Sequence, residues 1–398
     1  MQKFLLAFDK CKGSLSASEL CELAENYLKK RYLGCQVKKA PLTDGGEGFV
    51  EILTEAVNGE LHSVSVKNSI GEAKSANIGI CQLADTPHEV LSYFRLPENG
   101  KLGIVEMAQS AGLADLAMNQ RDPWKTSTYG VGEMLKEASL LGVNAILLGI
   151  GGSSTNDIGL GALAALGATF WDQNDQKITN PFPDHWQQII RIEFADLVSL
   201  PPLFVACDVD NPLLGENGAT AQYGPQKGLP LDQVKQFEEK IIHCQSLLRL
   251  SFQDADELAK FEGSGAAGGI GYGLSLPFSV SLVSGFDLIS KWFDLPNLVE
   301  NADVVLTGEG RFDKTSLSGK GPFELLRLAD KKLKSSILLA GSIEFDAVKD
   351  VCKEFHHCEL LQFGKNEWSL ERNLSLAEER FIDTLNAFSF ENMNDHAL

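Results

Sequence analysis

Charged side chains gather in glycine-rich stretches of this sequence, and the mixture suits phosphoryl transfer. Such a reaction needs cations and backbone N–H groups for the phosphates, carboxylates for magnesium, and one carboxylate that accepts a hydroxyl proton. Asp157 and Asp208 stand out because each closely follows a buried apolar run. Any single acid could instead cap a helix or close a turn. The candidates are Asp9, Asp44, Glu47, Asp157, Asp208, Asp210, Glu309 and Asp313, with Lys12, Lys227, Arg311 and Lys320 as cations.

Five glycine clusters carry these residues, at 44–48, 149–162, 215–228, 262–273 and 307–321. Such segments let backbone N–H groups approach an anion, although glycine also makes ordinary turns. No P-loop motif is present. Gly263-Ser-Gly265-Ala-Ala-Gly268 has the G-x-G-x-x-G spacing, but it follows the polar stretch "DADELAKFE" and not a strand, which argues against a dinucleotide site.

The elements that must position these residues alternate between strands and helices. Apolar runs predict strands at Phe4–Phe8, Val37–Pro41, Ala145–Ile150, Leu203–Val209, Val304–Thr307, Ile337–Ala340 and Leu360–Phe363. Helical patterns cover Ser16–Leu33, Val131–Leu141, Leu231–Leu250 and Pro322–Lys334, and Ser16 and Glu19 have the spacing of a capping box. This alternation predicts an α/β fold.

Five of these strands, two near the start and three near the end of the chain, form a doubly wound sheet of order 2-1-3-4-5 in our prediction. The intervening segment, roughly two hundred residues, should be an inserted domain. In that order the first and third strands are neighbours, so the loops at 9–14 and 307–321 should meet where ligands bind. We expect Lys12 and Ser14 to present an anion site at the N-terminus of the first helix, with Lys12 preferred to Lys10 because it adjoins Gly13.

The composition limits the classes of partner. The formal net charge of -19 and a pI near 4.8 disfavour nucleic-acid and membrane-surface binding. The eight cysteines contain no C-x-x-C pair, and the N-terminal apolar run ends at Phe8, too early for a signal segment or a membrane span. These features predict a cytoplasmic enzyme with reduced thiols. A hydrolase triad is disfavoured because no G-x-S-x-G elbow occurs.

Seven motifs together resemble the type I glycerate kinases of bacteria, in order and in spacing. They are "AFDKCKGSLSASE", "PLTDGGEG", "RDPWKTSTYGVGE", "LGIGGSSTNDIGLGALAALGA", "ACDVDNPLLGENGATAQYGPQKG", "GSGAAGGIGYGL" and "ADVVLTGEGRFDKTSLSGKGP". The resemblance implies ATP-dependent phosphorylation of D-glycerate with Mg²⁺. It also implies a discontinuous flavodoxin-like doubly wound domain, expected at 1–62 and 285–398, and a restriction-endonuclease-like inserted α/β domain at 63–284.

Several positions depart from the family pattern, among them Thr43, which stands where the family commonly has Ala. Cys11 takes a place that is usually aromatic. Ile158 replaces a glycine, which should restrict the backbone there to negative φ. Thr315 and Ser316 stand where the family commonly has Gln and Thr, so a ligand hydrogen bond could differ.

The resemblance and the residue chemistry together give a hypothesis for the site, in the cleft between the two domains. D-glycerate would be held by Asp9, Lys12, Ser14, Asp44, Asn156 and Arg311, and ATP by Gly265, Gly268, Gly269, Gly308, Glu309, Gly310 and Lys320. Asp208 or Asp157 would accept the hydroxyl proton, with Lys12 also catalytic. Asp44 or Asp313 would hold magnesium directly or through water, and these roles are interchangeable at this stage.

Several alternatives remain open from the sequence. The resemblance favours 2-phosphoglycerate as the product. A glycerate 3-kinase giving 3-phosphoglycerate is the alternative, because the two products differ by one carbon in the seating of the substrate, which no residue spacing reports. An NAD(P)-linked hydroxyacid dehydrogenase would use the "GSGAAG" segment, and a binding protein for sugar acids would keep the site without turnover. The oligomeric state, a homodimer among the options, is also open.

Overall fold

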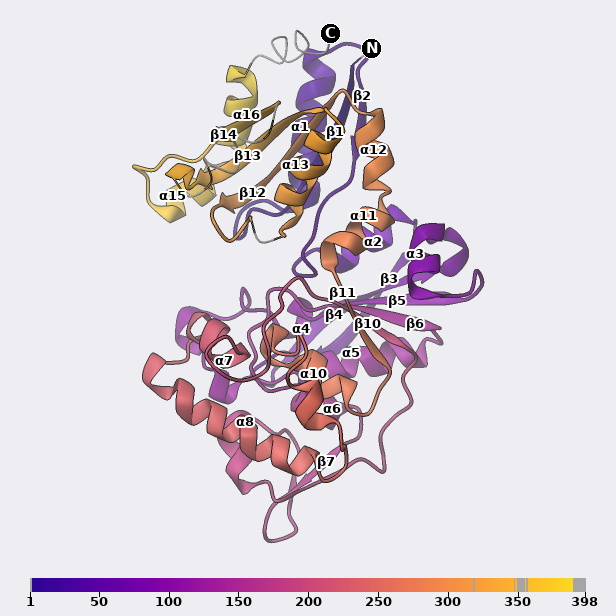
Figure 1. Cartoon of the computed structure of the whole chain (residues 1–398), viewed down its shortest axis with the longest axis vertical. Coiled ribbons are helices and arrows are strands. Elements are labelled where there is room, and N and C mark those ends of the chain that lie inside the picture. Colours follow the sequence, from indigo (N-terminus) through magenta and orange to yellow (C-terminus); the bar gives the residue numbers. More distant parts are fainter. Residues whose placement is uncertain (1, 318, 347, 349–354, 356, 389–398) are drawn as a thin grey trace. The chain divides into compact units, whose positions relative to one another are not determined.

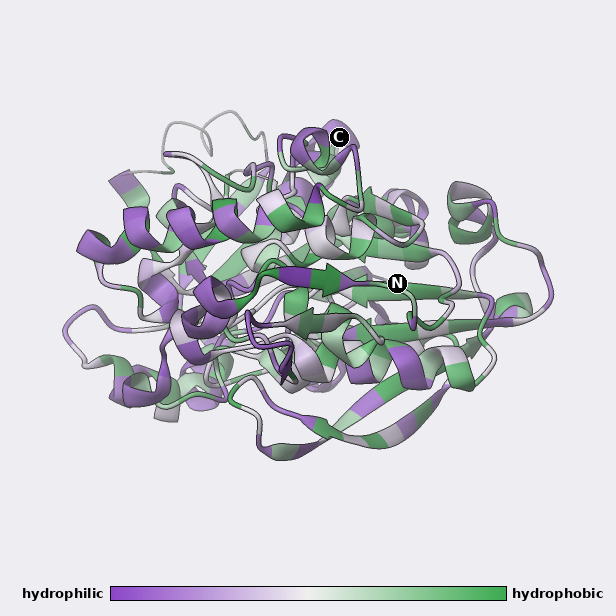
Figure 2. Cartoon of the chain, turned by 90° about the horizontal axis from the view of Figure 1, so that it is seen from below, coloured by the Kyte–Doolittle hydropathy of each residue, from purple (hydrophilic) through white to green (hydrophobic). Residues whose placement is uncertain are grey.

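The chain forms two units, each built around its own central sheet (Figure 1). The computed structural model describes residues 2–317, 319–346, 348, 355 and 357–388. The first unit combines Met1–Asp44 with Phe286–Leu398, and the second comprises Gly45–Gly285. Both units are mixed α/β structures, one with a parallel sheet and the other with a mixed sheet. Figure 2 shows that hydrophobic residues are concentrated in the strands, whereas the helices alternate hydrophobic and hydrophilic residues.

The sheet of the first unit has the predicted strand order. Its five strands are all parallel and run β2-β1-β12-β13-β14 across the sheet. The first and third strands along this part of the chain, β1 and β12, are therefore neighbours, with Phe8 opposite Gly308. The bounds are β1 Lys3–Phe8, β2 Gln36–Lys39, β12 Val304–Phe312, β13 Ser335–Ile343 and β14 Cys358–Gln362.

Helices cover both faces of this sheet. Leu339 of β13 packs in the same hydrophobic cluster as α1 and α16, whereas its neighbour Leu338 packs in a second cluster with α13. The predicted capping box is confirmed at α1, because Glu19 N–H donates to Ser16 Oγ at 3.2 Å and Ser16 N–H donates to Glu19 Oε2 at 2.8 Å. The helices are α1 Ala17–Arg31, α11 Gly285–Trp292, α12 Leu295–Asn301, α13 Gly321–Lys331, α15 Leu370–Ser375 and α16 Ala377–Ala387.

The second unit contains a six-stranded mixed sheet of order β11-β10-β6-β5-β4-β3. The four strands β5, β6, β10 and β11 are parallel, and the antiparallel pair β3 and β4 extends the sheet at one edge. A three-stranded sheet, β8-β7-β9, lies elsewhere in this unit. The bounds are β3 Glu60–Lys67, β4 Ala73–Gln82, β5 Lys101–Glu106, β6 Ala145–Gly149, β7 Thr169–Trp171, β8 Lys177–Ile178, β9 Arg191–Glu193, β10 Leu203–Ala206 and β11 Val280–Val283.

The helices of the second unit are mostly short, and several begin directly after a glycine-rich turn. The longest is α8, whose buried face includes Phe237, Ile241 and Leu248. The bounds are α2 Phe49–Ala56, α3 His88–Phe94, α4 Ala108–Ala111, α5 Tyr129–Leu140, α6 Leu160–Ala165, α7 Ala219–Tyr223, α8 Val234–Leu248, α9 Ala255–Leu258 and α10 Ile270–Ser275.

The chain leaves the first unit earlier than we expected. The division falls after Asp44, whereas we predicted a boundary at residue 62, and the return after Gly285 is within one residue of the prediction. The reason is that α2 packs on β4 and β5, and β3 pairs with β4, so the segment after Asp44 belongs to the second sheet. In the described part of the chain, no helix is long and apolar enough to cross a membrane.

Candidate active site

The ends of β1 and β12 bring together the two loops that the sequence predicted to meet. Asp9 N–H donates to Gly308 O at 2.8 Å, directly after the paired strands. A methyl group on Gly310 would lie 3.2 Å from Cys11 Cα, so these two segments are in close contact. The residues Gly308–Arg311, which we expected in a loop, continue β12.

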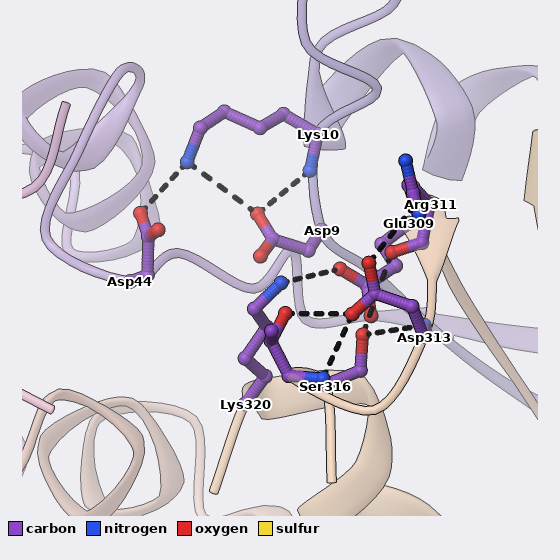
Figure 3. Close-up of polar contacts among 9 residues, drawn as sticks. Asp9, Lys10, Asp44, Glu309, Arg311, Asp313, Ser316 and Lys320 are labelled. Atoms are coloured by element: carbon purple, nitrogen blue, oxygen red, sulfur yellow. Dashed lines mark hydrogen bonds and ion pairs between the residues drawn. The ribbon is translucent and has the colours of Figure 1, made fainter. Parts of the chain in front are cut away.

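A group of charged side chains lies at these strand ends, and we call Asp9, Lys10, Asp44, Glu309 and Lys320 the strand-end cluster (Figure 3). Lys10 Nζ is 2.7 Å from Asp44 Oδ1 and 3.7 Å from Asp9 Oδ1. Lys10 N–H also donates to Asp9 Oδ1 at 2.7 Å. Burial raises the pKa of Asp9 to about 7; the charge of Lys10 opposes this shift, and the charges of Asp44 and Glu309 add to it.

The preference for Lys12 over Lys10 is not supported by the contacts. Lys12 is exposed, and its ammonium group has no partner among the residues that the structure describes, whereas Lys10 joins two carboxylates. Ser14 turns back, and its hydroxyl donates to Cys11 O at 3.1 Å. The N-terminus of α1 is capped by the Ser16 hydroxyl and the Glu19 carboxylate, and the anion site that we expected there stays a prediction.

Glu309 is a buried carboxylate contributed by β12. It is 6% exposed, its Oε2 lies 3.4 Å from Lys320 Nζ, and its Oε1 has no hydrogen-bond partner in the described structure. Burial raises the pKa of Glu309, and the charge of Lys320 partly offsets the increase. Lys320 precedes the first residue of α13, so its position is fixed by the start of that helix.

Asp313 and Arg311 follow on the same strand end (Figure 3). Arg311 Nε lies 2.9 Å from Asp313 Oδ2, and Thr315 donates to Asp313 Oδ1 from its backbone at 2.8 Å and from its hydroxyl at 2.7 Å. Partial burial alone would raise the pKa of Asp313, but the Thr315 hydrogen bonds and the charges of Lys320 and Arg311 together hold it below its usual value. Asp313 is therefore ionised at neutral pH.

The second unit carries a buried polar turn, residues 153–157, which we call the buried turn. Asp157 accepts Thr128 N–H at 2.7 Å, Thr128 Oγ1 at 2.9 Å, Gly161 N–H at 3.2 Å and Gly159 N–H at 3.3 Å. Burial raises the pKa of Asp157 despite these hydrogen bonds. Asn156 Nδ2 donates to Thr220 Oγ1 at 3.0 Å. The turn therefore depends on internal hydrogen bonds for most of its polar atoms.

The backbone of Ile158 corrects one of our expectations. We predicted negative φ at this position, but φ is +48°, in the left-handed region. Packing imposes this conformation: Ile158 N–H donates to Gly268 O at 2.8 Å, and a methyl group on Gly273 would lie 2.1 Å from Ile158 O. The family's glycine at this position suits the same backbone at lower cost, so Ile158 carries strain.

Asp208 follows β10 as predicted and links it to the segment after β11. Its Oδ1 accepts Gly285 N–H at 2.7 Å and Ser284 Oγ at 3.2 Å. The position is one residue beyond Cys207, whose backbone N–H donates to Val283 O at 2.8 Å. Asp208 therefore lies at the carboxyl ends of two adjacent parallel strands, which is the usual edge for functional side chains in such sheets.

The glycines of the segment 263–269 are used for packing inside the second unit. A methyl group on Gly265 would lie 2.1 Å from Pro212 O, and one on Gly268 would lie 2.2 Å from Thr155 O. The segment follows α9 and not a strand, as the sequence indicated. Our expected ATP ligands are thus divided between the units, with Gly265, Gly268 and Gly269 in the second, and Gly308, Glu309, Gly310 and Lys320 in the first.

Two lysines have contacts that the sequence did not predict. The sequence favours Lys12 over Lys10, and it gives Lys227 no role beyond that of a cation. Lys227 is 5% exposed and donates to Ser153 Oγ at 2.9 Å and to Thr155 O at 2.6 Å. The signal for Lys227 was its place in "YGPQKG", within a glycine cluster.

Comparison with known proteins shows to which family this chain belongs. The model of the glycerate kinase family matches residues 4–388. The chain belongs to the glycerate kinase family. It is 37% identical to a glycerate kinase of Haemophilus influenzae, over 87% of this chain and 88% of that protein. It is 33% identical to a protein of Escherichia coli named glycerate 2-kinase, over 86% of each.

A solved structure agrees with this membership in the family. A crystal structure of a protein from Salmonella typhimurium LT2, provisionally named glycerate kinase 2, matches with a TM-score of 0.74 at 31% identity. The match covers 96% of this chain and 95% of that chain. The resemblance seen in the seven motifs is therefore confirmed, and the protein is a kinase.

Proposed function

We propose that the protein transfers the γ-phosphoryl group of ATP to the 2-hydroxyl of D-glycerate, giving 2-phosphoglycerate and ADP. The strand-end cluster is the observation that carries this proposal: buried carboxylates and two lysines meet at the switch point of a doubly wound sheet. The choice of the 2-hydroxyl is supported by the name of the Escherichia coli relative, glycerate 2-kinase.

The phosphates of ATP need cations and N–H groups. We assign this role to Lys320, which Glu309 holds by an ion pair of 3.4 Å, together with the backbone of Gly308 and Gly310. Gly265, Gly268 and Gly269 remain proposed ATP contacts of the second unit. The hydroxyl groups and the carboxylate of D-glycerate are assigned to Asp9, Lys12, Ser14, Asp44, Asn156 and Arg311. That the reaction takes place between the two domains stays a prediction.

The proton of the attacking hydroxyl needs an acceptor. Of our two candidates we favour Asp208, because it is partly exposed at the carboxyl end of β10, whereas Asp157 is 0% exposed. Asp208 uses Oδ1 to hold Ser284 and Gly285, which fixes the orientation of its carboxylate. If Asp208→Asn kept near-normal kcat, this assignment would be wrong.

Magnesium bound with ATP would neutralise charge on the transferred phosphoryl group. Among the residues that the structure describes, no three or more His, Cys, Asp or Glu side chains form a metal cage. This fits Mg²⁺ in kinases, which is held by one or two carboxylates and by substrate phosphates. Asp313, ionised and on the same strand end as Glu309, fits that need, and Asp44 is the alternative.

The architecture we propose is a flavodoxin-like domain interrupted by a restriction-endonuclease-like α/β domain. The strand order β2-β1-β12-β13-β14 and its parallel pairing support the first half of this description. The acidic charge and the cysteine pattern support a cytoplasmic enzyme that acts on small molecules and not on nucleic acid. A homodimer remains an option.

One experiment tests the activity and the position of transfer together. Phosphorus NMR of the product from D-glycerate and ATP should show the resonance of 2-phosphoglycerate, with ADP formed in equal amount. A 3-phosphoglycerate resonance would instead support the 3-kinase. No phosphorylated product, combined with NAD(P)H absorbance on incubation with D-glycerate, would support a dehydrogenase and overturn the proposal.

A further inference from the structure

Lys227 is a buried cation for which the proposed reaction has no role so far. It is the last residue of the short 3₁₀ helix Pro225–Lys227 and is 5% exposed. An ammonium group has three N–H donors. Within the described structure, two of them reach acceptors, Ser153 Oγ at 2.9 Å and Thr155 O at 2.6 Å. When Lys227 is protonated, one N–H donor is thus left for another acceptor.

Two polar atoms of the buried turn are also unmatched. Thr155 Oγ1 and Asn156 Oδ1 have no hydrogen-bond partner in the described structure, although these residues are 0% and 1% exposed. If the Asn156 side-chain amide were flipped, Oδ1 would face Thr220 Oγ1, and Nδ2 would become the atom without a hydrogen-bond partner. Buried polar atoms in native proteins nearly always have partners. One segment therefore combines an unused ammonium donor with unused hydroxyl and amide groups.

Close packing restricts the backbone that follows Lys227, and the exposure of neighbouring residues indicates the side from which a ligand would approach. Gly228 has φ of +101°, and a methyl group there would lie 2.0 Å from Arg121 O, which fixes the end of the 3₁₀ helix. Exposure decreases along the turn, from partly exposed Gly152 to 9% at Ser153 and 0% at Thr155. A small ligand would therefore reach the ammonium group from the side of Ser153.

We propose that Lys227 binds the carboxylate of the hydroxy acid substrate, while Asn156 and Thr155 bind its hydroxyl groups. The inference rests on the proposed function and names the carboxylate as the group that the second unit recognises. A carboxylate accepts hydrogen bonds and a hydroxyl both donates and accepts, so a hydroxy acid supplies what these three side chains lack. Lys12, which is exposed, would contribute less, because water screens its charge.

This assignment predicts that substrate binding takes up a proton. Burial lowers the pKa of Lys227 to about 7, and the charge of Asp157 opposes that shift. Tyr223 is the titratable residue of α7, which packs against the 3₁₀ helix, but its hydroxyl donates to Asn211 Oδ1 at 2.6 Å. A bound carboxylate would raise the pKa of Lys227, so more of it becomes protonated at pH 7.5.

Calorimetry with D-glycerate tests the proposal directly. Titrations of the full chain at pH 7.5 in buffers of different ionisation enthalpy should show proton uptake. Lys227→Met should weaken D-glycerate binding by about 10- to 100-fold, the effect of losing one charged hydrogen bond, and should lose proton uptake. Lys125→Met, at an exposed lysine of the same unit, is the matched control and should bind as the wild type does.

Lys227→Arg and glycerol serve as a second variant and a second ligand, which test the roles of the charge and of the carboxylate separately. Lys227→Arg stays charged at every pH used, so we expect it to bind D-glycerate without proton uptake at this position. ATP binding should be unchanged in both variants, which also shows that they fold. Glycerol, which lacks the carboxylate, should bind equally weakly to wild type and Lys227→Met.

The outcomes separate this inference from the proposed function. Wild-type protein that neither binds nor phosphorylates D-glycerate contradicts the proposed function itself. Wild-type activity together with unchanged D-glycerate affinity and unchanged proton uptake in both Lys227 variants would overturn the inference and leave Lys227 a structural residue. Should methionine at 227 prevent folding, the comparison of wild type with Lys227→Arg decides.

Discussion

Asp9 in the strand-end cluster of the first unit and Lys227, which contacts the buried turn of the second, reach the same pKa from opposite directions. Asp9 is a carboxyl whose pKa is raised to about 7, and Lys227 is an ammonium whose pKa is lowered to about 7. Burial is the leading cause in both cases, because it disfavours whichever form is charged. Neighbouring carboxylates add to the shift at Asp9, whereas Asp157 opposes the shift at Lys227.

Burial therefore makes the contributions of Asp9 and Lys227 to stability depend on pH in opposite directions. Native protein holds a proton on Asp9 that the unfolded chain releases between pH 3.8 and 7, so this group lowers stability as pH rises through that range. Native protein releases a proton from Lys227 that the unfolded chain keeps between pH 7 and 10.5, so this group raises stability as pH increases through that range.

Replacing Asp9 should have the largest effect. Asp9→Asn removes the cost of burying a carboxylate and should increase the free energy of unfolding at pH 8 by at most about 4 kcal/mol, with little gain at pH 4. Activity should fall about 100-fold or more, because a buried carboxyl group proposed to bind D-glycerate is lost. Urea unfolding at both pH values and steady-state kinetics measure the two effects.

The control for Asp9 is Asp196→Asn, at an exposed carboxyl of the other unit. It should change neither stability nor activity. Equal stability of Asp9→Asn and wild type at pH 8 would show that Asp9 is ionised at little cost, and the contrast between the units would then disappear.

The stability of Lys227→Met should depend on pH in the opposite sense. Below pH 7 the wild type bears the full cost of a buried ammonium, and this cost declines by at most about 1.4 kcal/mol per pH unit above pH 7. The free energy of unfolding of the variant, relative to that of the wild type, should therefore be highest at pH 6 and lowest at pH 9. Urea unfolding across this range checks the slope, and a flat difference would contradict it.

Backbone strain at Ile158 should be detectable in the stabilities of two variants, with effects smaller than those expected for Asp9 and Lys227. A left-handed backbone costs an alanine about 1 to 2 kcal/mol but costs glycine little, so Ile158→Gly should be more stable than Ile158→Ala by about 1 kcal/mol. Ala162→Gly, in α6, is the control and should be less stable than wild type by about 1 kcal/mol. Thermal unfolding measures both, and Ile158→Ala proving the more stable variant would refute the strain.

The smallest effects should come from the partners of Asp9. Lys10→Met removes a charge that lowers the pKa of Asp9, and Asp44→Asn removes one that raises it. The pKa of Asp9, measured by carbon NMR of its carboxyl, should therefore increase in the first variant and decrease in the second. Shifts in the same direction would show that the cluster acts through structure and not through charge.

The sheet of the first unit was predictable because its three central strands, β1, β12 and β13, contain buried, nearly continuous apolar runs, although its edge strand β2 is mostly exposed. The hairpin of β3 and β4 was missed because only part of it is buried, and its residues alternate with polar ones. The same omission misplaced the boundary, since α2 and β3 belong to the sheet that this hairpin extends. Short continuous apolar runs indicate strands that are buried on both faces. They do not reveal half-exposed strands such as β3 and β4 at the edge of a mixed sheet.

Within the site, the loops that meet were predictable, but the side chains that make contact were not. Lys10 and Lys12 flank Cys11, and only the direction of each side chain decides which one reaches Asp44. Ile158 takes positive φ because Gly268 and Gly273 pack against its backbone, and those contacts involve residues more than a hundred positions away. Lys227 is likewise defined by its burial against Ser153 and Thr155.

The pairing of β1 with β12 sets an order in which the protein can be made. Thr307 Oγ1 donates to Ala7 O across 300 residues of chain. During synthesis the second unit is complete once Gly285 has emerged. At that point β1, the apolar strand that precedes Asp9, still lacks its partner strand β12. Until β12 emerges, this strand has an open edge that another chain or a chaperone could bind. The strand-end cluster therefore cannot form until Glu309 and Lys320 have emerged, after the second unit is complete.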